Sequence, residues 1–320
     1  MVIDSTDILE NIAQLRHHPS VVDKMAIGQT YRHLGKSVTS SVYFKNESTD
    51  IKLGDDTAAI RQADGSHLLL ASEGIVEDFL INDPWFAGYS AVMVNISDIC
   101  AMGGLPIAVT DTLYAKDQED IEEIWKGMLA ASHNYGVPIV GGHTCYHSEK
   151  LALSVSILGK ATQYVLTSFD ALPDEELLLA IDQSGSYYKD YLFWNASTTT
   201  TPEILKKNVT LPYEIANRQW SSAAKDISMG GIIGTICMLM NTSQVGVEIN
   251  LEAITKPAAI SWNKWLVSFP SYGYLFTCKA KHKKDMMTIF FDNGIQCDHI
   301  GHIQPVKELI INYRGNKLKF

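Results

Sequence analysis

Acids, amides and glycines recur at the ends of the helices and strands that this 320-residue sequence predicts. Carboxylate oxygens are the ligands that Mg²⁺ prefers, and glycines let the backbone come close to phosphate groups. For any one acidic pair a solvated turn is the likelier explanation, but the whole set is typical of a site for magnesium and a nucleotide. The residues concerned are Gly54, Asp55, Asp56, Glu73, Asn95, Asp98, Gly141, Gly142 and Asp226.

Asp98 is the acid that a solvated turn explains least well, because it lies in an apolar segment. The segment predicts a helix that starts near Pro84 and ends at Gly103 and Gly104, with proline at an early helical position. At helical spacing Asn95 and Asp98 share one face. Burying polar side chains without partners is costly, so we expect this face to look into a polar site and the opposite face to pack in a core.

Composition narrows the classes of function. The formal charge of −10 and the pI near 5.4 argue against a nucleic-acid-binding surface. Five scattered cysteines without a Cys-x-x-Cys pair argue against a disulfide framework. The sequence contains no signal-peptide pattern and no apolar run of about 18 residues. We therefore expect a cytoplasmic protein that binds a small molecule and has no nucleic-acid or membrane partner.

The predicted elements indicate an α+β fold with two domains, 1–165 and 166–320. In the first, strands and helices alternate in a way that favours a mixed or antiparallel sheet with helices on one face. Residues 137–140 read as a short buried strand in this sheet. Residues 20–50 read as an irregular loop, and residues 184–210 as polar and exposed.

The order of the motifs resembles the AIR synthetase (PurM-like) superfamily. Within it, the chain is most similar to the AIR-synthase-related and thiamine monophosphate kinase-like branch. The resemblance covers nearly the whole chain. It rests on Gly54-Asp55-Asp56, a strand ending in Glu73, Asn95-x-x-Asp98-x-x-x-Met102-Gly103, Gly141-Gly142-His143-Thr144, and Asp226-Ile227-Ser228-Met229-Gly230-Gly231.

The resemblance implies a fold and an activity. The N-terminal sheet would pair with that of a twin subunit into a barrel, making a homodimer, and the C-terminal domain would be an α/β sandwich. Bound ATP and Mg²⁺ would serve transfer of the γ-phosphoryl group to, or activation of, an oxygen of a small metabolite. The implied catalytic residues are Asp56, Asp98, His143 and Asp226. The implied metal ligands are Asp55, Asp56, Glu73 and Asp98. The implied nucleotide contacts are Gly54, Asn95, Gly103, Gly141, Gly142, Thr144, Gly230 and Gly231.

Three departures from the kinase branch leave alternatives open. Glu73, His143 and Met229 stand where that branch tends to have aspartates. The chain could be a thiamine-monophosphate kinase, or a nucleotide-binding regulatory or scaffold protein that has lost turnover. His143, Cys145 and His147 alternate, so in a strand they would face one side and could ligate zinc; packing in a loop or core is the simpler interpretation.

Overall fold

The computed structural model describes residues 5–34, 43 and 54–320. The chain begins with helix α1 (Ser5–Ala13), a 3₁₀ turn (Gln14–His17) and helix α2 (Pro19–Leu34). The prediction of an irregular segment from residue 20 is therefore wrong as far as Leu34. The helix has little amphipathic pattern of its own, and Val21 anchors it in the core of the C-terminal sheet. Most of the remaining predicted loop lies outside the described residues.

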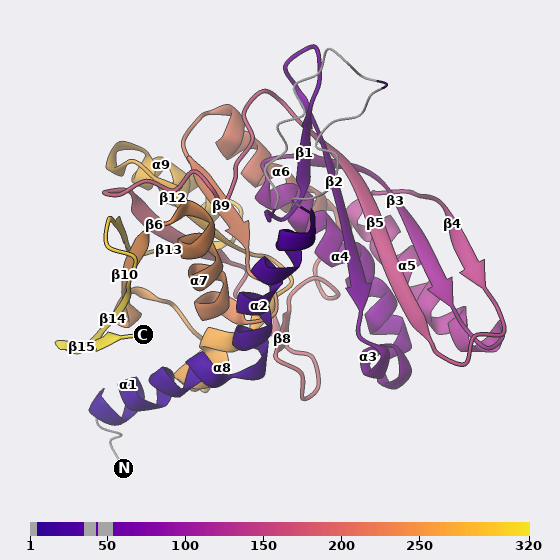
Figure 1. Ribbon diagram of the computed structural model, residues 1–320, viewed down its shortest axis with the longest axis horizontal. Coiled ribbons are helices and arrows are strands. Elements are labelled where there is room, and N and C mark those ends of the chain that lie inside the picture. Colours follow the sequence, from indigo (N-terminus) through magenta and orange to yellow (C-terminus); the bar gives the residue numbers. More distant parts are fainter. Residues whose placement is uncertain (1–4, 35–42, 44–53) are drawn as a thin grey trace.

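The N-terminal sheet has five strands in the order β1-β2-β5-β3-β4. Neighbours are antiparallel except β3 and β4, which are parallel, so the predicted mixed sheet is confirmed. Helices α3, α4 and α5 belong to this layer, and α4 and α5 cover one face of the sheet (Figure 1). The bounds are β1 Ala58–Arg61, β2 His67–Ile75, α3 Glu77–Asn82, α4 Pro84–Ala101, β3 Leu105–Tyr114, a 3₁₀ turn Glu119–Ile121, α5 Glu122–Tyr135, β4 Ile139–Cys145 and β5 Ala152–Ala161.

Helix α4 is the segment predicted from about residue 84, and it lies at the centre of the molecule. It packs against β2 and β5 on one side, α5 on another, and α6 and β9 of the C-terminal half on a third. A helix surrounded in this way must be apolar on nearly all sides. Two glycines allow α4 and α5 to touch: a Cβ on Gly88 would overlap the Ile124 carbonyl oxygen, and one on Gly127 would overlap the Trp85 carbonyl oxygen.

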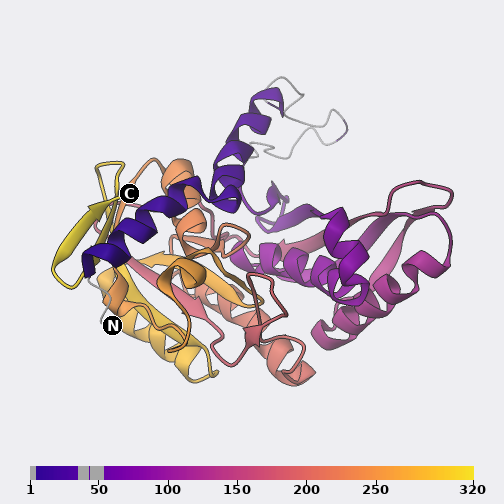
Figure 2. The same cartoon turned by 90° about the horizontal axis from the view of Figure 1, so that it is seen from below.

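The C-terminal half contains a seven-stranded sheet, ordered β15-β14-β10-β13-β6-β12-β9, and a small sheet, ordered β11-β8-β7. Figure 2 shows these orange and yellow elements beside the purple N-terminal layer. The bounds are β6 Glu176–Ile181, β7 Ser186–Tyr187, β8 Phe193–Asn195, α6 Pro202–Asn217, β9 Ala223–Asp226, α7 Gly231–Ser243, β10 Gly246–Asn250, a 3₁₀ turn Leu251–Ala253, α8 Trp262–Val267, β11 Phe269–Pro270, β12 Gly273–Cys278, α9 Ala280–Phe291, β13 Gln296–Gln304, β14 Leu309–Tyr313 and β15 Asn316–Lys319.

Three segments differ from the sequence expectation. Helix α1, within the first domain expected at residues 1–165, contacts α8 and β15 of the C-terminal half (Figure 1). Its Leu9 and Ile12 belong to the core of the C-terminal sheet. Within residues 184–210, β8 is buried and α6 begins at Pro202, so the prediction of an exposed stretch is wrong there. Strand β4 is an edge strand with Val140 exposed, not a buried one. In the described part of the chain, no helix is both long and apolar enough to cross a membrane.

Candidate active site

Three aspartates from separate parts of the chain meet between the two layers. Asp56 precedes β1, Asp98 lies in the last turn of α4, and Asp226 ends β9. One carboxylate oxygen from each lies within 4.8 Å of the others. Among the described residues, this is the only group of three or more His, Cys, Asp or Glu side chains placed to share a metal ion. The structure thus brings together three of the four residues predicted to be catalytic.

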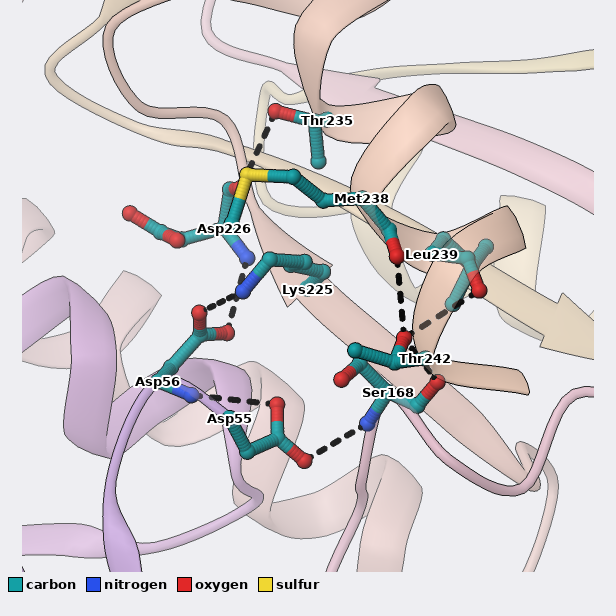
Figure 3. A network of polar contacts seen from close by, with 9 residues as sticks. All are labelled: Asp55, Asp56, Ser168, Lys225, Asp226, Thr235, Met238, Leu239 and Thr242. Carbon is teal, nitrogen blue, oxygen red and sulfur yellow. Dashed lines mark hydrogen bonds and ion pairs between the residues drawn. The ribbon is translucent and has the colours of Figure 1, made fainter. Parts of the chain in front are cut away.

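A lysine is built into this acidic cluster. Lys225 is only 2% exposed, and its ammonium group forms an ion pair with Asp56 (Figure 3). The backbone N–H of Asp226 also donates to the Asp56 carboxylate, at 3.4 Å. Burial alone would lower the pKa of Lys225, but the charges of Asp56, Asp55 and Asp226 raise it above its ordinary value. The ammonium therefore stays charged and balances part of the negative charge.

Burial and repulsion by neighbouring carboxylates raise the pKa values of Asp98 and Asp226. Desolvation, followed by the charge of Asp56, raises the pKa of Asp226 to about 7. Desolvation and the charges of Asp226, Glu73 and Asp56 raise the pKa of Asp98 well above its ordinary value. One Asp98 carboxylate oxygen, Oδ2, is buried without a hydrogen-bond partner. Crowded carboxylates with an unsatisfied oxygen fit a divalent cation, which would supply the missing positive charge.

Asp55 points away from this cluster and joins the domains. Its two oxygens accept the N–H of Asp56 at 3.0 Å and the N–H of Ser168 at 2.8 Å. The Ser168 carbonyl in turn accepts the hydroxyl of Thr242, on α7, at 2.7 Å (Figure 3). Desolvation and the neighbouring Asp56 raise the pKa of Asp55 to about 6. Although predicted as a metal ligand, Asp55 ties the loop before β1 to the interdomain segment in this structure.

The acidic cluster lies in a cleft of about 570 Å³ between the layers. Glu73, at the far end of β2, lines this cleft outside the group of three, and desolvation raises its pKa. Lys24 of α2 also lines it, and the positive charge of Lys24 acts on both Glu73 and Asp226. The rest of the lining is largely apolar. The cleft therefore has a charged part and an apolar part.

The predicted glycine and amide contacts divide between the cleft and the core. Gly54 and Gly230 line the cleft, and Gly230, at φ 101°, precedes the first turn of α7. Gly231, at φ 63°, has no room for a Cβ because Val267 packs against it. Gly103 is likewise closed in, by Ala216 and Leu166. Asn95 is fully buried and donates to the Ala91 carbonyl one turn earlier, so it supports α4 from within.

The Gly-Gly-His-Thr motif is not brought to this cleft. Gly141, Gly142, His143 and Thr144 lie in β4, at the edge of the N-terminal sheet, and none of them lines the cleft. Gly142 has a packing role, because a Cβ there would overlap the buried Asp111 carboxylate. His143 contacts Cys145 at 3.1 Å. The described residues around this pair contain no group of three metal ligands, so the zinc alternative gains no support from the structure.

Sequence reasoning missed several side chains in the cleft. Lys225 is adjacent to Asp226 in a quoted motif but received no role, because four-residue β9 carries little strand signal. Lys24 falls within residues 20–50, which the sequence predicts to be an irregular loop. Ser90, on α4, lines the cleft, and its hydroxyl is buried without a hydrogen-bond partner. Its spacing of eight residues from Asp98 is the one signal that could have marked it.

Comparison with known protein families shows to which family this chain belongs. The N-terminal domain of AIR synthase related proteins matches residues 54–161, and the C-terminal domain of the same family matches residues 181–314. This chain belongs to the AIR synthase related protein family. The resemblance read from the motif order is thereby confirmed, as is the two-domain mixed fold. The match begins at Gly54, so the first two helices lie outside it.

Relatives of this AIR synthase related protein include uncharacterised proteins and kinases. It is 44% identical to an uncharacterised protein of Synechocystis sp., over 82% of this chain and 81% of that one. It is 32% identical to the thiamine-monophosphate kinase of Pyrococcus horikoshii, over 66% of this chain and 70% of the kinase.

Solved structures share the fold. One is T. maritima PurL complexed with ADP, at a TM-score of 0.72 and 17% identity. That match covers 84% of this chain but only 45% of the PurL chain. Another is AaThiL complexed with AMPPCP and TMP, at a TM-score of 0.67 and 19% identity, covering 91% of this chain and 93% of that one.

Proposed function

We propose that this protein is a Mg²⁺- and ATP-dependent enzyme that transfers the γ-phosphoryl group to an oxygen of a small molecule, or activates that oxygen. The observation that carries the proposal is the meeting of Asp56, Asp98 and Asp226 between two domains. Solved structures with this fold are complexes with ADP, ATP and AMPPCP, which supports a nucleotide at the cleft.

The chain's own residues suit phosphoryl transfer. Asp56, Asp98 and Asp226 would hold Mg²⁺, which when bound neutralises phosphate charge. Lys24 can meet the phosphates, and Gly230 leaves room for them beside α7. The acceptor oxygen forms a bond to the γ-phosphorus as the bond from that phosphorus to the bridging oxygen breaks. ADP leaves with the bonding electrons, and the acceptor's proton passes to solvent. Positioning and charge neutralisation carry such a reaction, and no covalent protein nucleophile is needed.

A calorimetric titration with AMPPCP, with and without Mg²⁺, tests the nucleotide site. We expect Asp98→Asn to weaken Mg²⁺-dependent binding strongly without lowering the melting temperature, because its carboxylate serves the ligand. Asp285→Asn is the matched control, since Asp285 is an exposed acid on α9. Absence of binding to the wild type in both conditions would contradict the proposal, as would unchanged binding in Asp98→Asn.

Thiamine-monophosphate kinase is the second candidate activity, favoured by the P. horikoshii relative. Met229 speaks against it, because this side chain is 50% exposed and lines the cleft where the kinase motif has an acid. Incubation with thiamine monophosphate, Mg²⁺ and ATP, followed by chromatography, tests it, and absence of product excludes it. Sustained ATP turnover on any substrate, abolished in Asp56→Ala, would exclude the regulatory alternative.

The proposal includes a homodimer through the open face of the N-terminal sheet. Helices α4 and α5 cover one face only (Figure 1). On the other face Leu70 of β2 stands opposite Leu158 of β5, and both are exposed. Covering such side chains would favour association. Light scattering tests this, and a monomer at micromolar concentration would contradict the homodimer and its barrel.

A further inference from the structure

One wall of the cleft is aromatic. Phe79 of α3 and Tyr191 lie edge to face, with ring centroids 5.1 Å apart. Phe193 of β8 and Phe269 of β11 lie edge to face at 4.9 Å. All four line the cleft, and Phe86 of α4 joins the two pairs from behind. Such a wall offers edges and faces to a planar ring.

Helix α4 connects this wall to the acidic cluster. Ser90 follows Phe86 by one turn and precedes Asp98 by eight residues, which corresponds to about 12 Å along the helix axis. Ser90 is only 5% exposed, it lines the cleft, and its hydroxyl has no hydrogen-bond partner. A buried hydroxyl of this kind is stabilised when a ligand supplies the missing bond.

An interdomain hydrogen-bond network fixes the aromatic wall in place. Asp83, just before α4, accepts the Tyr191 hydroxyl at 2.7 Å and the Tyr188 hydroxyl at 3.5 Å, and it pairs with Lys189. Desolvation would raise the pKa of Asp83, but the hydrogen bonds from Lys189 and Tyr191 lower it below its ordinary value. The Tyr191 ring is thus held before any ligand arrives, which reduces the entropy lost on binding.

The charged part of the cleft and the aromatic wall lie at different places along it. Lys24 and Gly230 lie together, since a Cβ on Gly230 would lie 3.3 Å from Lys24 Cγ, and Lys24 acts on the acids of the cluster. Figure 1 shows α2 beside α7, whereas α3 and β8 lie toward the start of α4. In-line transfer places the donor and acceptor on opposite sides of the moving phosphoryl group. The side with Lys24, Gly230 and the proposed Mg²⁺ ligands suits the phosphates of the nucleotide, which leaves the aromatic side for the acceptor.

We propose that the acceptor carries a planar heteroaromatic ring with a hydrogen-bond acceptor, bound by the aromatic wall and by the Ser90 hydroxyl. Its reacting oxygen extends toward Asp98. This inference rests on the proposed function for the reacting end, but the ring subsite is defined by Phe79, Tyr191 and Ser90 independently of catalysis. Tyr191 and Ser90 are specificity-determining residues in this scheme.

The test measures three alcohols on protein loaded with Mg²⁺ and AMPPCP, by saturation-transfer NMR. Pyridinemethanols offer a ring and a ring acceptor, benzyl alcohol a ring only, and cyclohexylmethanol neither. We expect affinity to fall in that order, by up to about tenfold at each step. Ser90→Ala should bring the pyridinemethanols to the level of benzyl alcohol without changing benzyl alcohol itself. Tyr191→Leu should weaken both aromatic probes, and Tyr191→Phe, which keeps the ring, should weaken them less.

Three results separate the possibilities. Equal affinities for all three alcohols in the wild type, or equal losses for all three in Ser90→Ala, would overturn the ring subsite. Weaker AMPPCP binding in both variants, with unchanged tripolyphosphate binding, would assign the wall to the nucleotide base and overturn the acceptor assignment. If AMPPCP does not bind but the aromatic probes still depend on Tyr191, the proposed function fails and the ring subsite stands.

Discussion

Replacing Asp226 by asparagine should make the metal-free protein more stable at pH 8. The pKa of Asp226 rises from 3.8 to about 7, chiefly because of desolvation and then the charge of Asp56. Folding therefore favours the protonated carboxyl, and the folded chain holds a proton that the unfolded chain releases above about pH 4. Stability from this group is full below pH 4 and is lost as the pH rises toward 7. The shift corresponds to about 4 kcal/mol as an upper bound.

Urea denaturation in EDTA at pH 5 and at pH 8 measures this effect. Asparagine cannot ionise, so we expect Asp226→Asn to unfold at a higher urea concentration than the wild type at pH 8, and at pH 5 the difference should be less than half as large. Adding Mg²⁺ at pH 8 should stabilise the wild type by mass action and leave the variant unchanged. A variant that is less stable than the wild type at both pH values would refute the reasoning, as would one with the same pH dependence.

Further predictions concern the same cleft and the helix behind it. Mg²⁺-dependent AMPPCP binding should tighten from pH 6 to pH 8, because the raised pKa values of Asp98 and Asp226 make protons compete with the cation; calorimetry in two buffers should show proton release, and pH-independent affinity would contradict this. Gly127→Ala should destabilise the protein by about 1–3 kcal/mol or more, because its Cβ would overlap the Trp85 carbonyl. Gly234→Ala is the matched helical control, since its Cβ meets nothing nearer than 4.0 Å; urea denaturation compares the two, and equal effects would contradict the packing argument.

The individual site residues were more predictable than their arrangement. Asp98 could be recognised from the sequence because burying a charged side chain on an apolar helix is costly unless it has a partner or a ligand. Its meeting with Asp226 depends on β9, whose Ala-Ala-Lys-Asp sequence has no strand pattern and which is held by pairing with β12. Tertiary pairing, which no local pattern records, therefore decided the geometry of the cluster.

The Gly-Gly-His-Thr motif shows a different limit of sequence reasoning. It follows the other motifs along the chain, and motif order suggested one shared site. The sheet order places β5 and β3 between β2 and β4, so the motif lies away from Glu73 and the acidic cluster within this chain. If the open faces of two sheets pair as proposed, β4 would lie near the partner subunit.

The buried ammonium group of Lys225 offsets part of the repulsion among the three aspartates and leaves negative charge for a metal ion to neutralise. Three carboxylates within 4.8 Å repel one another, and one buried ammonium neutralises a single charge of the three. The raised pKa values of Asp98 and Asp226 show that the compensation is incomplete, since burial and the remaining negative charge still favour protonation. A divalent cation would neutralise the remaining negative charge. It could bind Asp98 Oδ2 without breaking a hydrogen bond, because this oxygen has no partner. The electrostatic strain that limits stability near neutral pH is therefore the same property that should make the site bind Mg²⁺.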